Sequence, residues 1–300
     1  MAGFTNSKNG FWAFIDIDEG DYVSFLYGAR IKNLYRVKKK VAYKNARDLP
    51  PWNPIRFRSG QEYYFPFRLY LEPKLYLDES MVKPQMAYVA ENLLLRGGYR
   101  KTHFQTDKLT LYNVSNMGEP AEAGIHKPIY HKGETFEPTI VFKKNMQKIP
   151  ERYLFNELIL QSILKKSLRK ILPEILMRLG WNENAENFEI LGEKALPEGF
   201  IDIFIKPKHP VGPGKYMLVE VKKDRANEKD LNQLLNYLLE FRGLPVAGIL
   251  VAKTFSRKSV SRIKELHHNI IPVSYSLRVS LDKEYSYHEL LEDITLKLNI

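Results

Sequence analysis

The chain has 300 residues, of which 44% are hydrophobic and 12% aromatic, so wholesale disorder is excluded and two domains are favoured. It has no cysteine, which excludes disulfides, cysteine-ligated zinc, iron–sulfur clusters and thiol catalysis. Its formal net charge of +11 indicates a polyanionic partner, most simply nucleic acid.

Segments that would place the chain in or across a membrane are not evident. No apolar run is long enough to span a bilayer, and the N-terminus lacks a basic-then-apolar signal pattern. We therefore expect a cytoplasmic protein with no membrane partner. The absence of cysteine, with abundant Lys, Glu, Ile and Tyr, suggests a thermophile. Because no Walker loop is present, no nucleotide cofactor is expected.

Residues 1–112 are predicted to form short strands around one helix. Ile-Asp-Ile-Asp at 15–18 leads into a turn at Gly20 and Asp21, and aromatic and β-branched runs follow. The predicted strands are 22–27, 34–37 and 63–71, the last interrupted by Pro66, and the predicted helix is 84–95. This order predicts a small barrel-like α+β domain.

Residues 113–149 are rich in glycine and proline and have little hydrophobic periodicity. We expect a long inter-domain linker there, with one strand near 139–142. Residues 1–112 hold 18 basic and 11 acidic side chains, so the predicted N-terminal domain carries most of the positive excess.

Residues 150–300 are predicted to form an α/β domain. A helical period over 151–179 predicts one long helix that Pro173 kinks or splits. Strands are then predicted at 200–206, 216–222, 246–252 and 270–275, with helices at 228–242 and 256–267.

Three charged residues interrupt two of these apolar strands: Asp202 in the first, and Glu220 and Lys222 in the second. Since side chains alternate between the faces of a strand, Asp202 can face Glu220 across a hairpin, with Lys222 on the same face. Burying two carboxylates side by side is costly unless a cation neutralises them. Carboxylate ligands without Cys or His select Mg²⁺ or Mn²⁺.

Such a metal would hold a water and a phosphate oxygen, while Lys222 positions or deprotonates the water and neutralises developing charge. This chemistry is phosphodiester hydrolysis. The alternative is a structural ion pair in which Lys222 bridges Glu220 and Asp202 on an exposed sheet face.

The arrangement resembles the PD-(D/E)xK nuclease superfamily, whose core has the order α-β-β-β-α-β, with Asp on one strand and Glu-x-Lys on the next. Gln233 and Tyr237 resemble the Gln-x-x-x-Tyr helix motif of its RecB-like branch, and the stretch from 199 to 252 resembles the nuclease domain of the NucS/EndoMS mismatch endonucleases. The resemblance implies catalytic roles for Asp202, Glu220, Lys222, Gln233 and a metal-assisting Glu157, metal ligation by Asp202, Glu220 and Val221, and nucleic-acid contact by Tyr237. Helix-face packing is the alternative for Gln233 and Tyr237, and plain solvent exposure for Glu157.

The N-terminal half resembles the EVE domain of the PUA-like group. The shared features are Phe11-Trp12, Gly-Asp-Tyr-Val-Ser-Phe at 20–25, Pro51-Trp52 and Phe-Pro-Phe-Arg-Leu at 65–69. This resemblance implies a pocket for a flipped, modified base, walled by Trp12 and Trp52 with Tyr64 or Phe11 as a third side. Packing in a hydrophobic core is the alternative for each.

Two groups of basic residues are candidates for contact with phosphates. The first is the run around Arg36, Lys38 and Lys39, which equally suits a solvated edge strand. The second flanks Gly97-Gly98 and consists of Arg96, Arg100 and Lys101.

Together these patterns predict a modification-dependent DNA endonuclease of the restriction type. It would cut duplex DNA near a modified base in the N-terminal domain, as a homodimer, because one such site cuts one strand. The first alternative is a repair endonuclease for mismatched, damaged or branched DNA. The second is a non-catalytic reader of modified nucleic acid, which the intact Asp202, Glu220 and Lys222 disfavour.

Overall fold

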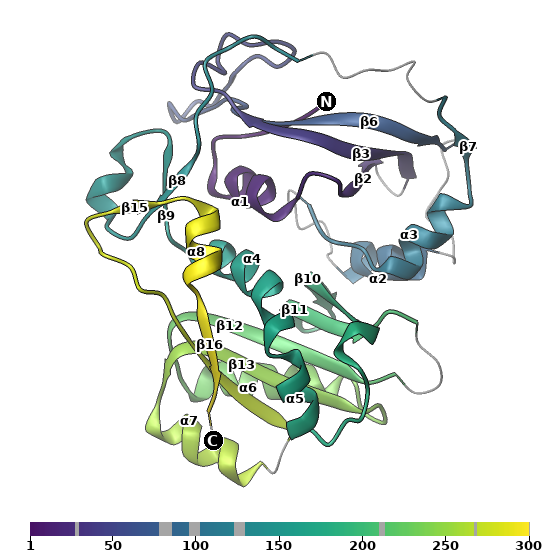
Figure 1. Cartoon of the computed structure of the whole chain (residues 1–300), viewed down its shortest axis with the longest axis vertical. Helices are drawn as coiled ribbons and strands as arrows, with labels where there is room; N and C mark the ends of the chain where they lie inside the picture. The colour runs from purple at the N-terminus through teal and green to yellow at the C-terminus, as the bar shows by residue number, and fades with distance from the viewer. Residues whose placement is uncertain are drawn as a thin grey trace.

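Two β-sheets with helices between and around them organise the chain (Figure 1). The structure is a computed structural model, and it describes residues 1–27, 30–77, 86–95, 103–122, 130–209, 214–266 and 269–299. In those ranges no helix is long and apolar enough to cross a membrane.

The N-terminal sheet is antiparallel, with strand order β1-β6-β3-β2 and β7 paired to one end of β6. Its strands are β1 Ala2–Phe4, β2 Tyr22–Tyr27, β3 Arg30–Ala42, β6 Phe67–Tyr76 and β7 Glu119–Pro120, and a separate hairpin joins β4 Ile55–Arg56 to β5 Glu62–Tyr63. The predicted strands are present, and Pro66 immediately precedes β6. In the described residues the sheet is open rather than a closed barrel, because the short β1 pairs with β6 alone.

Helix α1, Lys8–Asp16, occupies a stretch that the strand-rich prediction missed. The Ser7 side chain caps it by accepting from the Gly10 N–H, and every residue from Gly10 to Asp16 is buried. Since apolar side chains project on all sides, the stretch has no polar stripe to indicate helical periodicity. Helices α2, Ala87–Leu95, and α3, Lys108–Ser115, follow, and α2 lies within the predicted range.

The described part of the segment from 113 to 149 contains two short strands and one 3₁₀ helix. Strand β7 extends the N-terminal sheet, and β8, Thr139–Val141, pairs with β9, Arg152–Leu154, and with β15, Glu284–Tyr285. The predicted strand near 139–142 is therefore present. The segment also contains the 3₁₀ helix Lys144–Lys148.

The second sheet has strand order β10-β11-β12-β13-β14-β16, in which only the β12–β13 and β13–β14 pairs are parallel. Its strands are β10 Phe188–Leu196, β11 Gly199–Pro207, β12 Tyr216–Ala226, β13 Val246–Phe255, β14 Ile270–Ser276 and β16 Thr295–Leu298. Its helices are α4 Glu157–Ser167, α5 Leu172–Arg178, α6 Glu228–Leu239, α7 Arg257–Glu265 and α8 Tyr287–Asp293, with 3₁₀ turns at Leu168–Lys170 and Ala185–Asn187.

Two differences from the sequence prediction matter for the site. The predicted long helix is split into α4 and α5, with Pro173 in the first turn of α5, where its missing N–H costs no hydrogen bond. Strand β10 was missed, because Gly192, Glu193 and Lys194 interrupt its apolar pattern. With β10 added, the element order around the site is α4-α5-β10-β11-β12-α6-β13.

One hydrophobic core crosses from the N-terminal sheet to the second sheet through α4. Phe14 of α1, Leu69 of β6, Leu160 of α4 and Val219 of β12 belong to the same buried cluster. The N-terminal sheet and the second sheet therefore share one hydrophobic core, to which α4 contributes.

We expect Leu160→Ala, which empties a fully buried position of this shared core, to lower the free energy of unfolding by about 2–5 kcal/mol. Thermal unfolding of the full chain should remain a single transition, moved as a whole. Two resolved transitions, of which only one moves, would contradict a shared core.

Candidate active site

Asp202 and Glu220 lie opposite each other at one end of the β11–β12 pairing. Ile203 pairs with Val219, so the next residue on each strand is Asp202 and Glu220. The Lys222 Nζ is 2.8 Å from Oε1 of Glu220, whose side chain is 2% exposed. Strand register and alternation thus bring the three residues together as the sequence predicts.

Hydrogen bonds from two sides hold the Asp202 carboxylate. The Gln161 side chain on α4 donates to Oδ1 at 2.7 Å, and the Val221 main-chain N–H donates to Oδ2 at 2.7 Å. Gln161 was missed in the sequence, although it lies four residues after Glu157 and so on the same helix face. That spacing could have indicated it.

Two further carboxylates approach Lys222. Glu157 at the start of α4 has Oε1 4.0 Å from the Lys222 Nζ, and Asp230 on α6 has Oδ1 3.9 Å from it. The structure therefore brings Glu157 to the cluster and adds Asp230, which the sequence analysis did not select.

The crowding of negative charge shifts the pKa values at the site. Burial raises the pKa of Asp202 well above its usual range, and the Glu220 carboxylate raises it further. Burial also raises the pKa of Glu220, against the effect of Lys222. Burial by itself would lower the pKa of Lys222, but Glu220 and the other carboxylates outweigh it and the pKa is raised. One lysine thus faces four carboxylates, and the site is short of positive charge.

The donor set fits a hard divalent cation such as Mg²⁺. Oε2 of Glu220 is buried without a hydrogen-bond partner among the described residues, and it lies beside the Asp202 carboxylate. Val221 could add only its main-chain oxygen, since its side chain is a hydrocarbon. In the described ranges no three His, Asp or Glu side chains form a complete ligand set. Two carboxylates completed by water and substrate oxygens suit Mg²⁺, which keeps part of its hydration shell.

Gln233 and Tyr237 bond to each other rather than to the carboxylates. The Gln233 side chain donates to the Tyr237 hydroxyl at 3.0 Å, and Tyr237 is buried. A Cβ added at Gly199 would lie 2.6 Å from that hydroxyl, so glycine allows the close approach of β11 to α6. The pair therefore braces the start of the strand that carries Asp202.

The aromatic residues predicted to wall a base pocket occupy separate environments. Phe11 stacks on Tyr153 in the shared core, Trp12 is 4% exposed and packs on His103, and Tyr64 is buried beneath Arg47. Trp52 is half-buried, between Phe65 and the guanidinium of Arg68. Across the residues described, no ring contact joins Trp12 to Trp52.

The predicted phosphate contacts divide in a similar way. Arg36, Lys38 and Lys39 are exposed on β3, where Lys38 forms an ion pair with Glu72 at 3.6 Å and Lys39 lies over the Tyr130 ring. Arg96, Arg100 and Lys101 lie outside the described residues.

A buried polar network joins α1 to α4 next to the carboxylates. Asp16 accepts hydrogen bonds from Ser162 at 2.9 Å and from Lys165 at 2.7 Å, and it lies 3.0 Å from Nε2 of His103. Ser162 follows Gln161, whose side chain holds Asp202. The network therefore fixes the segment of α4 that reaches the site.

Comparisons with known proteins find partial structural likeness only. Neither a protein-family model nor a curated protein sequence matches the chain. An EndoMS–double-stranded DNA complex matches 35% of this chain and 42% of its own length, with 23% identity and a TM-score of 0.26. A repair endonuclease from Pyrococcus abyssi matches 33% and 41%, with 23% identity and a TM-score of 0.25. The match therefore spans about two fifths of those chains, and at these TM-scores it carries no argument about this protein's activity.

We expect Asp16→Asn to lower the free energy of unfolding by about 3–5 kcal/mol, because it leaves Lys165 buried without its anion. Asp18→Asn, which breaks only the exposed pair with Lys166, should cost at most about 1 kcal/mol. Chemical denaturation of both variants measures the difference. Equal effects would contradict a buried ionic lock.

The same network predicts an acid-labile contribution to stability. Burial by itself would raise the pKa of Asp16, but Lys165 and His103 outweigh it and hold the pKa below its ordinary value. The stabilisation should be complete above about pH 4, the ordinary aspartate range, and lost as pH falls further. Subtracting the Asp16→Asn stability profile from that of the unmodified chain isolates this term, and a difference that grows towards low pH would contradict it.

Proposed function

We propose that the chain is a metal-dependent DNA endonuclease whose active site is formed by Asp202, Glu220 and Lys222. The observation that carries the proposal is a carboxylate pair held together by strand register, with one buried Glu220 oxygen lacking a hydrogen-bond partner among the described residues. The structural ion-pair alternative accounts for the contact of Lys222 with Glu220. It leaves Asp202 without a cation within hydrogen-bond distance in the described structure.

The residues divide the chemistry among them. A bound Mg²⁺ would polarise a phosphate oxygen and make its own water a better nucleophile. Lys222, whose raised pKa keeps it charged, would stabilise the negative charge that develops on the phosphate rather than remove a proton. Gln161 and the Val221 N–H hold the Asp202 carboxylate in one orientation.

The burial of the aromatic residues favours the repair reading over the modification-dependent one. Phe11, Trp12 and Tyr64 are buried, so they cannot stack on a flipped base unless the core opens. An enzyme that senses mismatched, damaged or branched DNA does not need such a pocket in the N-terminal half. A double-strand cut would still need two copies of the chain.

We expect Asp202→Asn, Glu220→Gln and Lys222→Ala each to lower the rate of plasmid nicking in Mg²⁺ by at least about a hundredfold. Asp202→Asn and Glu220→Gln remove charge with little change of shape, and Lys222→Ala removes the ammonium group together with its partly exposed stem. Glu174→Gln, an exposed substitution on α5, is the matched control and should leave the rate unchanged. EDTA should abolish nicking, and near-normal nicking by Asp202→Asn would place the active site elsewhere.

We expect Gln161→Met to weaken Mg²⁺ binding about ten- to a hundredfold, because it frees the Asp202 carboxylate to rotate. Calorimetric titration of Mg²⁺ measures this without catalysis, and nicking by the variant should recover at high Mg²⁺. Loss of nicking with unchanged metal affinity would give Gln161 a different role.

A further inference from the structure

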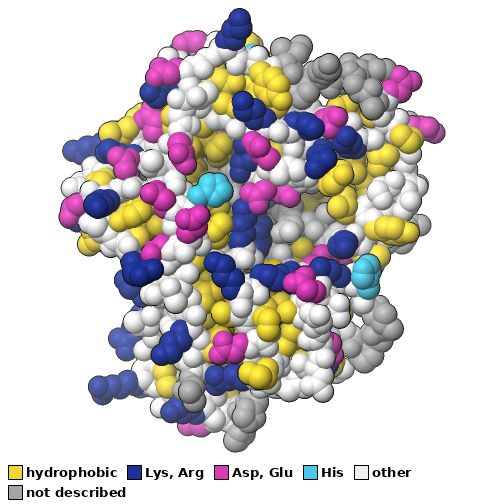
Figure 2. All heavy atoms as spheres, in the orientation of Figure 1, with side chains coloured by type: hydrophobic (Ala, Val, Ile, Leu, Met, Phe, Trp, Pro, Cys, Tyr) yellow, Lys and Arg dark blue, Asp and Glu magenta, His cyan; other side chains and the backbone are white. Residues whose placement is uncertain are grey.

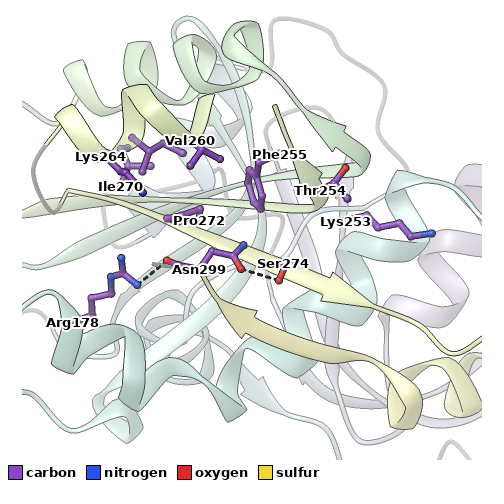
Figure 3. A pocket seen from close by; sticks show the side chains of 11 residues that line it. Arg178, Lys253, Thr254, Phe255, Val260, Lys264, Ile270, Pro272, Ser274 and Asn299 are labelled. Carbon is purple, nitrogen blue, oxygen red and sulfur yellow. Dashed lines mark hydrogen bonds between the residues drawn. The ribbon is translucent and has the colours of Figure 1, made fainter. Parts of the chain in front are cut away.

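A cavity of about 610 Å³ opens beside α7, away from the carboxylate cluster (Figure 3). This volume is in the range of small-molecule sites. Thr254, Ser274 and Asn299 contribute polar groups, and Ser274 donates to the Asn299 side chain at 3.2 Å. The apolar lining consists of Phe255, Val260, Ile263, Ile270 and Pro272.

Strand register places this cavity on the same sheet face as the candidate active site. Lys222 of β12 pairs with Ala252 of β13, and Ala252 pairs with Ser274 of β14. Paired residues project to the same face, so Lys222 and the cavity-lining Ser274 lie in one row, two strand spacings or about 10 Å apart.

All charged side chains that line the cavity are cations, namely Arg178, Lys253 and Lys264. They come from three elements and stand around the cavity in Figure 3. Arg178 donates to the main-chain oxygen of Asn299 at 2.8 Å. The exposed Arg257, Lys258 and Arg262 extend this positive surface along α7.

These cations form no ion pair in the part of the chain that the structure describes, whereas several cations of the N-terminal half do. There, Glu72 forms ion pairs with Lys38 and Lys74, and Glu62 with Arg47 and Arg56. On the face seen in Figure 2, Lys and Arg gather over the lower half and its boundary, whereas acidic side chains are more frequent above. Glu265 ends α7, but no ion pair joins it to Arg262 or Lys264 in the described ranges. Cations outside ion pairs are the ones that attract a polyanion.

We propose that the cavity beside α7 binds one nucleotide of single-stranded DNA, with the base against Phe255 and the adjoining phosphates on Lys264 and Arg262. An aromatic face within a positively charged groove is the composition of single-strand binding sites. The strand is unpaired because a duplex would hide the face of the base. The proposal rests on the proposed function for its choice of DNA, while the binding itself does not need cleavage.

The test is fluorescence anisotropy with a labelled 15-nucleotide oligo-dT, the full chain and EDTA. The double variant Arg262→Glu and Lys264→Glu should raise the Kd at least about tenfold. The control double variant Lys144→Glu and Lys148→Glu makes the same change in net charge at exposed positions of another element, and should raise it less than about twofold. Equal effects of the two double variants would overturn the proposal.

Base stacking is tested separately at Phe255. Phe255→Ala should raise the Kd for oligo-dT about five- to a hundredfold and leave that for heparin, a polyanion without bases, unchanged. Phe255→Tyr keeps an aromatic face and should bind as the unmodified chain does. If Phe255→Ala weakens heparin and oligo-dT equally, or neither, the nucleotide site is wrong.

The outcome is independent of the active-site proposal. Asp202→Asn should keep the oligo-dT affinity while losing Mg²⁺-dependent nicking. Normal oligo-dT binding by the α7 double variant, with nicking still dependent on Asp202, would remove the cavity proposal alone. Retained nicking by Asp202→Asn, with binding still dependent on α7, would remove the active-site proposal alone.

Discussion

The structure depends on one electrostatic constraint, the burial of two carboxylates side by side on adjacent strands. Asp202 and Glu220 are brought together by the register that pairs Ile203 with Val219, so neither can move away without breaking the sheet. Burial and mutual repulsion raise the pKa of Asp202, and Lys222 neutralises only part of the charge. Such an arrangement is costly for the stability of the fold, and a bound cation would offset that cost.

Helix α4 connects this constraint to the rest of the fold. One face of the helix is apolar and fills the core shared with α1 and β6, while Gln161 and Glu157 reach the carboxylate cluster. Ser162 and Lys165 on the same helix hold the buried Asp16 of α1. A displacement of the N-terminal half would therefore move Gln161 and with it the orientation of Asp202. The N-terminal half therefore supports the site.

The distribution of positive charge in the structure differs from what the residue counts indicate. By count, most of the excess lies in the first 112 residues, which suggested that DNA binds there. Several of those cations are paired with Glu62 and Glu72, whereas the cations around α7 form no ion pair in the described ranges. Since an ion pair presents little net charge to a ligand, local pairing matters more than regional counts.

The sequence by itself determined four strands of the second sheet, β11 to β14, and the meeting of Asp202, Glu220 and Lys222. Their apolar runs are local, and the two-residue period of a strand decides which side chains share a face. The same period failed for β10, whose interior is interrupted by glycine and charge, and the helical period failed for α1, which is buried on all sides. In both cases segments distant in the sequence bury the element, so its own residues do not show the expected hydrophobic period.

Only the tertiary structure decided which residues surround the carboxylates and which aromatic rings are accessible. Gln161 comes from α4, 41 residues before Asp202 in the chain, and Asp230 comes from α6, eight residues after Lys222.

 The register of β11 and β12 places the carboxylates, but the packing of α4 and α6 against that edge of the sheet decides which polar groups reach them. Likewise, the sequence alone does not distinguish a pocket wall from a core position for Trp12 or Tyr64. Their burial shows that both are packed inside the fold. The physical reason is that alternation within a strand is a local property of the backbone. Contacts between elements depend instead on how the whole chain buries its apolar surface.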